Sequence, residues 1–212
     1  MTAERIDPAS MPRKEIFDFF SGISDPFYSV TFRLDVTELY NYTHSRGISF
    51  YYSLCWLVTK AVNSVDAFSY AISGGELVKL KGRSPSFTDM KKGSECFHIV
   101  TMSCEGSMED FCRAAAEKSA AQTELIDMSC EGIDLIFISC LPWLDLTSLT
   151  NERDFDPNDA VPRISWGKYR EENGRKTLGM SVEVNHRFCD GIHIGRFAQK
   201  LEEMMGELRV RS

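Results

Sequence analysis

Residues 50–63 constrain the fold more than any other segment, because they are apolar on nearly every side of a helix. They read Phe-Tyr-Tyr-Ser-Leu-Cys-Trp-Leu-Val-Thr-Lys-Ala-Val-Asn. A helix that is hydrophobic all round has to be covered on more than one side, as happens when it is buried against a sheet. The sequence therefore predicts a protein built around this helix, with strands packed against it.

Strand patterns and helix patterns intermingle on both sides of this segment. Residues 27–34 alternate as a half-buried strand does, and the apolar run at 133–140 has the length of a central strand. Asn173-Gly174 is a hairpin signal between two further strand-like stretches. After residue 190, apolar residues recur at helical spacing and predict a core-facing stripe: Ile194, Phe197, Ala198, Leu201, Met205 and Leu208.

This pattern predicts an α/β protein of the α+β type, a two-layer sandwich of a mixed β-sheet with helices packed on it. With 212 residues and 43% hydrophobic content, we expect one domain over residues 1–212. No apolar run has the length of a membrane span and the start lacks a secretory signal, so we expect a cytoplasmic protein without a membrane partner.

The net charge and the cysteine pattern argue against a nucleic-acid-binding protein, a disulfide-rich protein and a zinc protein. The net charge of −7 argues against nucleic acid as a partner, because duplex binding needs a clustered basic surface. The seven cysteines include no C-x-x-C pair, and their flanks are apolar or mixed. We expect them to be reduced, as small hydrophobic residues, and not part of a disulfide framework or a zinc site.

Residues 184–193 read Val-Asn-His-Arg-Phe-Cys-Asp-Gly-Ile-His and contain the pattern H-x-x-x-D-G. An imidazole titrates near neutrality, so His186 leaving a strand is a candidate general base. The alternative is an ordinary turn in which Asp190 only caps a helix. A metal site of His186, Asp190 and His193 is disfavoured, because His186 is expected before the helix and His193 partly exposed within its first turn.

Three other blocks matter beside this one: Pro12-Arg-Lys-Glu-Ile-Phe-Asp-Phe-Phe20, Ser139-Cys-Leu-Pro-Trp143 and Ser165-Trp-Gly-Lys-Tyr169. Together with residues 184–193, and in the same order, they resemble the chloramphenicol acetyltransferase family. The resemblance implies a homotrimer with active sites at subunit interfaces. It also implies transfer of an acetyl group from acetyl-CoA to a hydroxyl of a small molecule, chloramphenicol or a similar xenobiotic, and hence a role in antibiotic resistance.

The resemblance assigns roles to individual residues. His186 would deprotonate the acceptor hydroxyl, and Ser139 would donate a hydrogen bond to the oxyanion. Asp190 would pair with Arg13 and hold the loop that presents the histidine. The residues implied to contact coenzyme A are Trp143, Lys168 and Tyr169. Those implied to contact the acceptor are Phe20 and Ser165, and no metal is implied.

Several positions depart from the family pattern. Asn185 stands where the family often has a first histidine, and Ser49 where a lysine helps to bind the coenzyme phosphate. Phe20 replaces a tyrosine and Pro26 a cysteine, which leaves the acceptor open. The alternatives are an acetyltransferase for a different hydroxylated acceptor, and a relative that binds acyl-CoA or a small ligand without turnover.

Overall fold

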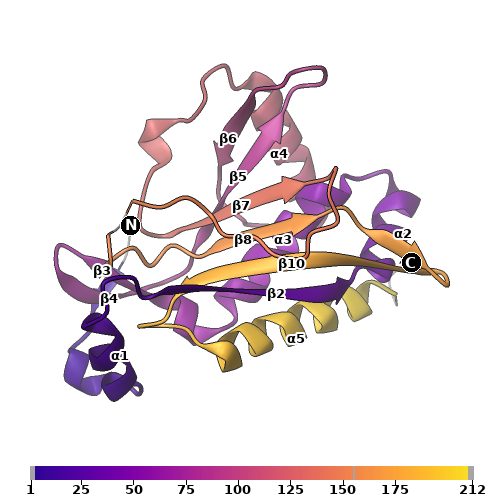
Figure 1. The fold of residues 1–212 in the computed structure, drawn as a ribbon. Helices are drawn as coiled ribbons and strands as arrows, with labels where there is room; N and C mark the ends of the chain where they lie inside the picture. Colours follow the sequence, from indigo (N-terminus) through magenta and orange to yellow (C-terminus); the bar gives the residue numbers. More distant parts are fainter. Residues whose placement is uncertain (1–2, 155, 210–212) are drawn as a thin grey trace.

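The computed structural model describes residues 3–154 and 156–209 (Figure 1). The helices are α1 (Lys14–Ser21), α2 (Thr37–Arg46), α3 (Phe50–Asn63), α4 (Met108–Ala121) and α5 (Gly191–Leu208), with short 3-10 turns η1 (Pro8–Ser10), η2 (Asp66–Ser69) and η3 (Met128–Cys130). The strands are β1 (Ala3–Arg5), β2 (Phe27–Asp35), β3 (Tyr70–Ser73), β4 (Glu76–Leu80), β5 (Ser84–Met90), β6 (Phe97–Thr101), β7 (Leu135–Leu141), β8 (Arg163–Gly167), β9 (Arg170–Glu172) and β10 (Arg175–Asn185).

Within the described residues, the larger sheet has seven strands in the order β2-β10-β8-β7-β5-β6, with β9 paired to β10. The β5–β7 and β7–β8 pairs are parallel and the other pairs are antiparallel. The sheet is therefore mixed, as the sequence predicts. Asn173 and Gly174 have φ values of 52° and 78°, as the predicted tight hairpin turn between β9 and β10 requires.

Helices cover one face of this sheet. α3 contacts α2, α4, α5 and β5, and Figure 1 shows α5 running along β2 and β10. The bounds of α3 are those predicted, and it is buried on most of its surface. The apolar stripe of α5 is buried from Ile194 to Leu208, except for Ala198, which is partly buried. The predicted sandwich is confirmed.

The segment after β7 covers part of the opposite face of the sheet. It lies so close to the strands that a Cβ atom on Gly167 would come within 2.5 Å of the Leu144 carbonyl oxygen. A Cβ on Gly179 would come within 1.8 Å of the Leu146 carbonyl oxygen. Glycine is required at both positions because only a missing side chain leaves room for this backbone. The crossing segment leads from the end of β7 to the start of β8.

The sequence prediction missed β5, which lies inside the sheet between β6 and β7. Its second residue is Pro85, and proline in a strand normally indicates an edge. Here Pro85 still accepts a hydrogen bond from the Met102 amide through its carbonyl, at 3.3 Å. The missing amide donor therefore costs one hydrogen bond without preventing the strand.

Two further features complete the fold. β1, β4 and β3 form a small antiparallel sheet, and Arg83 joins its surroundings to the larger one by donating to carbonyls of Phe68, Tyr70, Leu135 and Ala160, among others. All seven cysteines are free thiols. In the part of the chain that the structure describes, none of the helices combines the length and apolar character of a bilayer span.

Candidate active site

The ring of His186 is held between two aromatic side chains. β10 ends at Asn185, and the His186 amide donates to the Pro26 carbonyl at 2.7 Å. Phe20 of α1 stacks on the imidazole with a centroid distance of 4.0 Å and an interplanar angle of 7°, and Tyr28 of β2 packs on it at 4.3 Å. Nδ1 is buried and has no hydrogen-bond partner among the described residues, whereas Nε2 is not buried. The ring is therefore oriented by packing, with one nitrogen accessible.

Asp190 both pairs with Arg13 and caps the following helix, the two roles considered from the sequence. Its Oδ2 accepts a hydrogen bond from Nη2 of Arg13 at 2.5 Å, and its Oδ1 caps α5 by accepting from the Ile192 amide at 3.1 Å. Arg13 also donates to the Phe188 carbonyl at 2.6 Å. This ion pair, only partly exposed, fixes the turn between β10 and α5 from two sides.

His193 is buried at 7% exposure, so the expectation that it is partly exposed is wrong. The Asp190 amide donates to Nδ1 of His193 at 3.1 Å, which closes a capping box at the start of α5. Burial, together with the charge of Arg13, lowers the pKa of His193. The neutral imidazole is the form that can accept this hydrogen bond.

The residues on either side of His186 hold a loop that the sequence prediction did not connect to the site. Asn185 donates to the carbonyls of Pro157 and Asp159, both at 2.9 Å, and its own oxygen accepts from the Arg187 amide. Arg187 also donates to the Pro157 carbonyl, at 3.1 Å. The asparagine at the variable family position is therefore a buried cross-link, and Tyr28 and Arg187 are site neighbours that only the packing reveals.

Ser139 lies on β7, far along the sheet from His186. It lines a cavity of about 1120 Å³ on the sheet face opposite the helices, which Trp143 also lines. The wall of this cavity contains exposed apolar side chains: Met90, Phe97, Phe137 and Trp143. A large ligand therefore has an open, mostly apolar surface beside the Ser139 hydroxyl.

The residues expected to contact coenzyme A lie near the carboxyl ends of the parallel strands β7 and β8. Trp143 follows β7 and is 70% exposed. Lys168 follows β8, is exposed, and donates through its amide to the Leu144 carbonyl at 2.6 Å. Tyr169 packs on Tyr40 at 5.4 Å between ring centroids. The ends of parallel strands are where α/β sheets commonly bind ligands.

The two residues expected to contact the acceptor lie apart. Phe20 stacks on His186 and belongs to the histidine side. Ser165 pairs in register with Ser139 but is 1% exposed and does not line the cavity. A direct contact between Ser165 and an acceptor would therefore require its surroundings to open.

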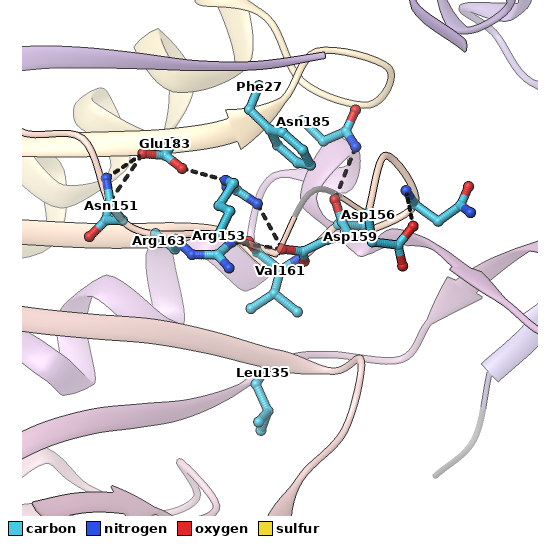
Figure 2. A network of polar contacts seen from close by, with 12 residues as sticks. Phe27, Leu135, Asn151, Arg153, Asp156, Asp159, Val161, Arg163, Glu183 and Asn185 are labelled. Atoms are coloured by element: carbon cyan, nitrogen blue, oxygen red, sulfur yellow. Dashed lines mark hydrogen bonds and ion pairs between the residues drawn. The ribbon is translucent and has the colours of Figure 1, made fainter. Parts of the chain in front are cut away.

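A charged network joins Arg153, Asp159 and Glu183 (Figure 2), and two of its arginines, Arg153 and Arg163, also line the cavity. Arg153 donates to Glu183 at 2.5 Å and to Asp159 at 2.7 Å, and its guanidinium lies 3.6 Å from the centre of the Phe27 ring. Burial alone would raise the pKa of Glu183, but hydrogen bonds from Asn151 and Arg153 outweigh it and hold that pKa below its ordinary value. Glu183 is therefore an ionised anchor for this loop.

His186 and Ser139 cannot meet within one chain. Ser139 and Ser165 are register partners, as are Ser165 and Ser181, and His186 lies beyond the end of β10. Standard strand rise and spacing then separate the two Cα atoms by about 19 Å. A single chain thus presents a histidine on one side and a serine-lined cavity on another.

Comparison with known proteins identifies the class. The family model described as chloramphenicol acetyltransferase matches residues 1–202. Chloramphenicol acetyltransferase 3 of Escherichia coli is 28% identical over 208 residues, which cover 96% of this chain and 97% of that protein. A chloramphenicol acetyltransferase of Clostridium perfringens is 28% identical, covering 97% of this chain and 99% of that protein.

Solved structures agree on the fold. A chloramphenicol acetyltransferase superposes with a TM-score of 0.89 at 23% identity, covering 96% of this chain and all of that one. A probable dihydrolipoamide acetyltransferase from Listeria monocytogenes gives 0.65 at 12% identity, covering 96% of this chain and 93% of that one. Together the comparisons define an acyltransferase. The chain belongs to the chloramphenicol acetyltransferase family.

Proposed function

We propose that this protein is an acetyl-CoA-dependent O-acetyltransferase that acts on a hydroxyl of a small molecule such as chloramphenicol. The observation that supports this most is the His186 turn. It holds one imidazole between two rings, with Nε2 accessible, on a chain that matches the family almost throughout. Neither an ordinary turn nor a simple binding surface needs an oriented, accessible imidazole.

His186 would act as the general base. An alcohol is a weak nucleophile at neutral pH, so the imidazole removes its proton as the oxygen attacks the thioester carbonyl. The proton passes to Nε2, and the breakdown of the addition product returns it to the departing coenzyme A sulfur. Because Phe20 and Tyr28 fix the ring plane, little reorganisation is needed when the acceptor arrives.

Ser139 would donate its hydroxyl to the negative oxygen that develops on the carbonyl. Its separation from His186 within a chain supports a site formed between copies, with the histidine of one copy facing the cavity of the next. The exposed apolar wall of the cavity supports the same arrangement, because large exposed apolar patches mark interaction surfaces. A closed ring of such head-to-tail contacts gives a cyclic oligomer, and the family resemblance points to three copies, a homotrimer.

Acetyl-CoA, as co-substrate, supplies the activated acetyl group. Trp143 fits a partly apolar ligand, since it lines the cavity and is largely exposed. Lys168 offers an exposed cation for a phosphate, and Tyr169 an aromatic surface nearby. Ser49 caps α3 by accepting from the Tyr52 amide, so it supports the fold and provides no cation.

The test follows free thiol release from acetyl-CoA with and without chloramphenicol. The proposal predicts release that depends on the acceptor and is lost in His186→Ala, with an unchanged circular dichroism spectrum. Thiol release with another alcohol but not with chloramphenicol would mean that the acceptor is a different molecule, while the proposed mechanism would stand.

The alternative, a relative that binds without turnover, predicts a different result. The protein would bind coenzyme A in calorimetry but release no thiol with any alcohol in a panel. That outcome would contradict the proposed function directly.

A further inference from the structure

Arg163 and Arg153 each leave donors without a partner among the described residues, but the unpaired Nη2 of Arg153 is buried, whereas the unpaired donors of Arg163 are not. Nη1 of Arg163 donates to Asp159 at 2.8 Å and to the Val161 carbonyl at 3.3 Å. Its Nε and Nη2 donate to no described residue, and neither atom is buried. Arg153, by contrast, is held by two carboxylates.

The carboxylate that Arg163 uses is already shared. Oδ2 of Asp159 accepts from both Arg153 and Arg163, and its Oδ1 accepts from the Val161 amide at 2.9 Å. Figure 2 shows the two arginines meeting at Asp159. Glu183 is engaged by Arg153, Asn151 and Ser29. Among the described residues, the network therefore contains no carboxylate that could neutralise Arg163 fully.

Arg163 lines the same cavity as Ser139 and lies over an apolar surface. Its guanidinium carbon is 5.3 Å from the centre of the Phe137 ring, and its side chain is 12% exposed. Strand register places its Cα about 8 Å from that of Ser139. Glu152 and Asp154 also border the cavity, but both are exposed and hydrated, so they compete weakly.

We propose that Arg163 selects acceptors that carry a carboxylate beside an apolar body. Such an acceptor would place its carboxylate on the free edge of the guanidinium, its ring on Phe137 and its hydroxyl toward Ser139. A planar guanidinium matches a carboxylate in a two-point contact, which is stronger and more specific than a neutral hydrogen bond. The inference rests on the proposed function, because it takes the Ser139 cavity as the place of acetyl transfer.

The experiment uses two acceptors that share the same ring and hydroxyl but differ in charge and by one methyl group: 4-(2-hydroxyethyl)benzoate and its methyl ester. We expect kcat/KM of the full chain with acetyl-CoA to favour the carboxylate by about tenfold or more. Arg163→Leu should remove this preference, mainly through KM for the carboxylate, and leave the ester within about threefold. Arg163→Gln keeps a donor for Asp159 and serves as the second variant if the leucine variant folds poorly.

Lys92→Leu is the matched control, because Lys92 is another cation of the cavity wall but is exposed. It should leave the preference unchanged. Equal kcat/KM for the two acceptors in the unchanged protein, or an equal loss for both in Arg163→Leu, would overturn the inference while acetyl transfer itself stands.

Calorimetric binding of the two acceptors, in the presence of coenzyme A, separates this inference from the proposed function. Tighter binding of the carboxylate that is lost in Arg163→Leu supports the inference even if no thiol is released. Equal binding of both acceptors contradicts it.

Discussion

The His186 turn and the Ser139 cavity differ in how completely one chain builds them. Around His186, the ring is stacked on both faces, Asp190 has both oxygens engaged, and Asn185 is buried in hydrogen bonds. Around Ser139, the surface is open, with Trp143 70% exposed. Under the proposed function, the chain would preorganise the base alone, and the oxyanion side would be completed from outside, by substrate and by a neighbouring copy.

The largest effect is expected from removing the base. His186→Ala should lower kcat by about 10²–10⁴-fold, because the hydroxyl then has no positioned proton acceptor. Single-turnover acetyl transfer measures this directly. A kcat within a few-fold of the original would mean that another group is the base.

In the Ser139 cavity, Ser139→Ala should lower kcat by about 10²–10³-fold through loss of one oxyanion donor. Because Ser139 lies in an open cavity, the melting temperature should change little. The comparison would fail if this variant lost stability instead of activity, since Ser139 would then be structural.

The ion pair behind the base is expected to matter less than the base itself. Asp190→Asn keeps a good helix cap but removes the charge that holds Arg13. We expect kcat to fall about tenfold to a hundredfold through misplacement of His186, and the free energy of unfolding to fall by about 1–3 kcal/mol. Steady-state kinetics and urea unfolding measure the two losses.

Lys14→Met is the control for that variant, because the Lys14–Asp18 pair lies on α1 directly after Arg13 but is exposed. An exposed pair of this kind contributes about 0–1 kcal/mol. Equal losses in the two variants would show that the Arg13–Asp190 pair has no special role.

The smallest effect concerns pH. Burial lowers the pKa of His193, so the folded chain binds fewer protons there than the unfolded chain does. The stabilisation is present above the unfolded pKa of about 6.5 and is lost as pH falls toward the lower folded pKa. Urea unfolding at pH 7.5 and 5.5 should show this loss, and His193→Gln should reduce it. An identical pH dependence in both proteins would contradict the assignment.

The spacing of apolar residues was sufficient to predict most of the fold. The chemistry of individual side chains was sufficient to predict part of the site. The α3 segment could be bounded from its sequence because apolar residues on nearly every side of a helix indicate burial against a sheet. β5 could not, because Pro85 is an unfavourable strand residue that only the neighbouring strands accommodate. The Arg13–Asp190 pair followed from the family resemblance and lies where expected.

The predictions that failed would have required knowledge of how the side chains pack. His193 was expected to be partly exposed, but it closes a capping box at the third helical position, where glutamate or glutamine is the usual signal and histidine is not. Arg153 and Arg163 carry no local motif, and their meeting at Asp159 depends on how the loop before β8 folds back. The separation of Ser139 from His186 likewise follows only from strand register.

The most direct test of a site divided between copies is complementation. His186→Ala and Ser139→Ala chains are expressed together, and thiol release is compared with each variant alone. If the histidine of one copy serves the serine of the next, random mixing restores about a quarter of the sites. Activity of the mixture near that level is the predicted result, and activity no higher than that of the separate variants would contradict a shared site.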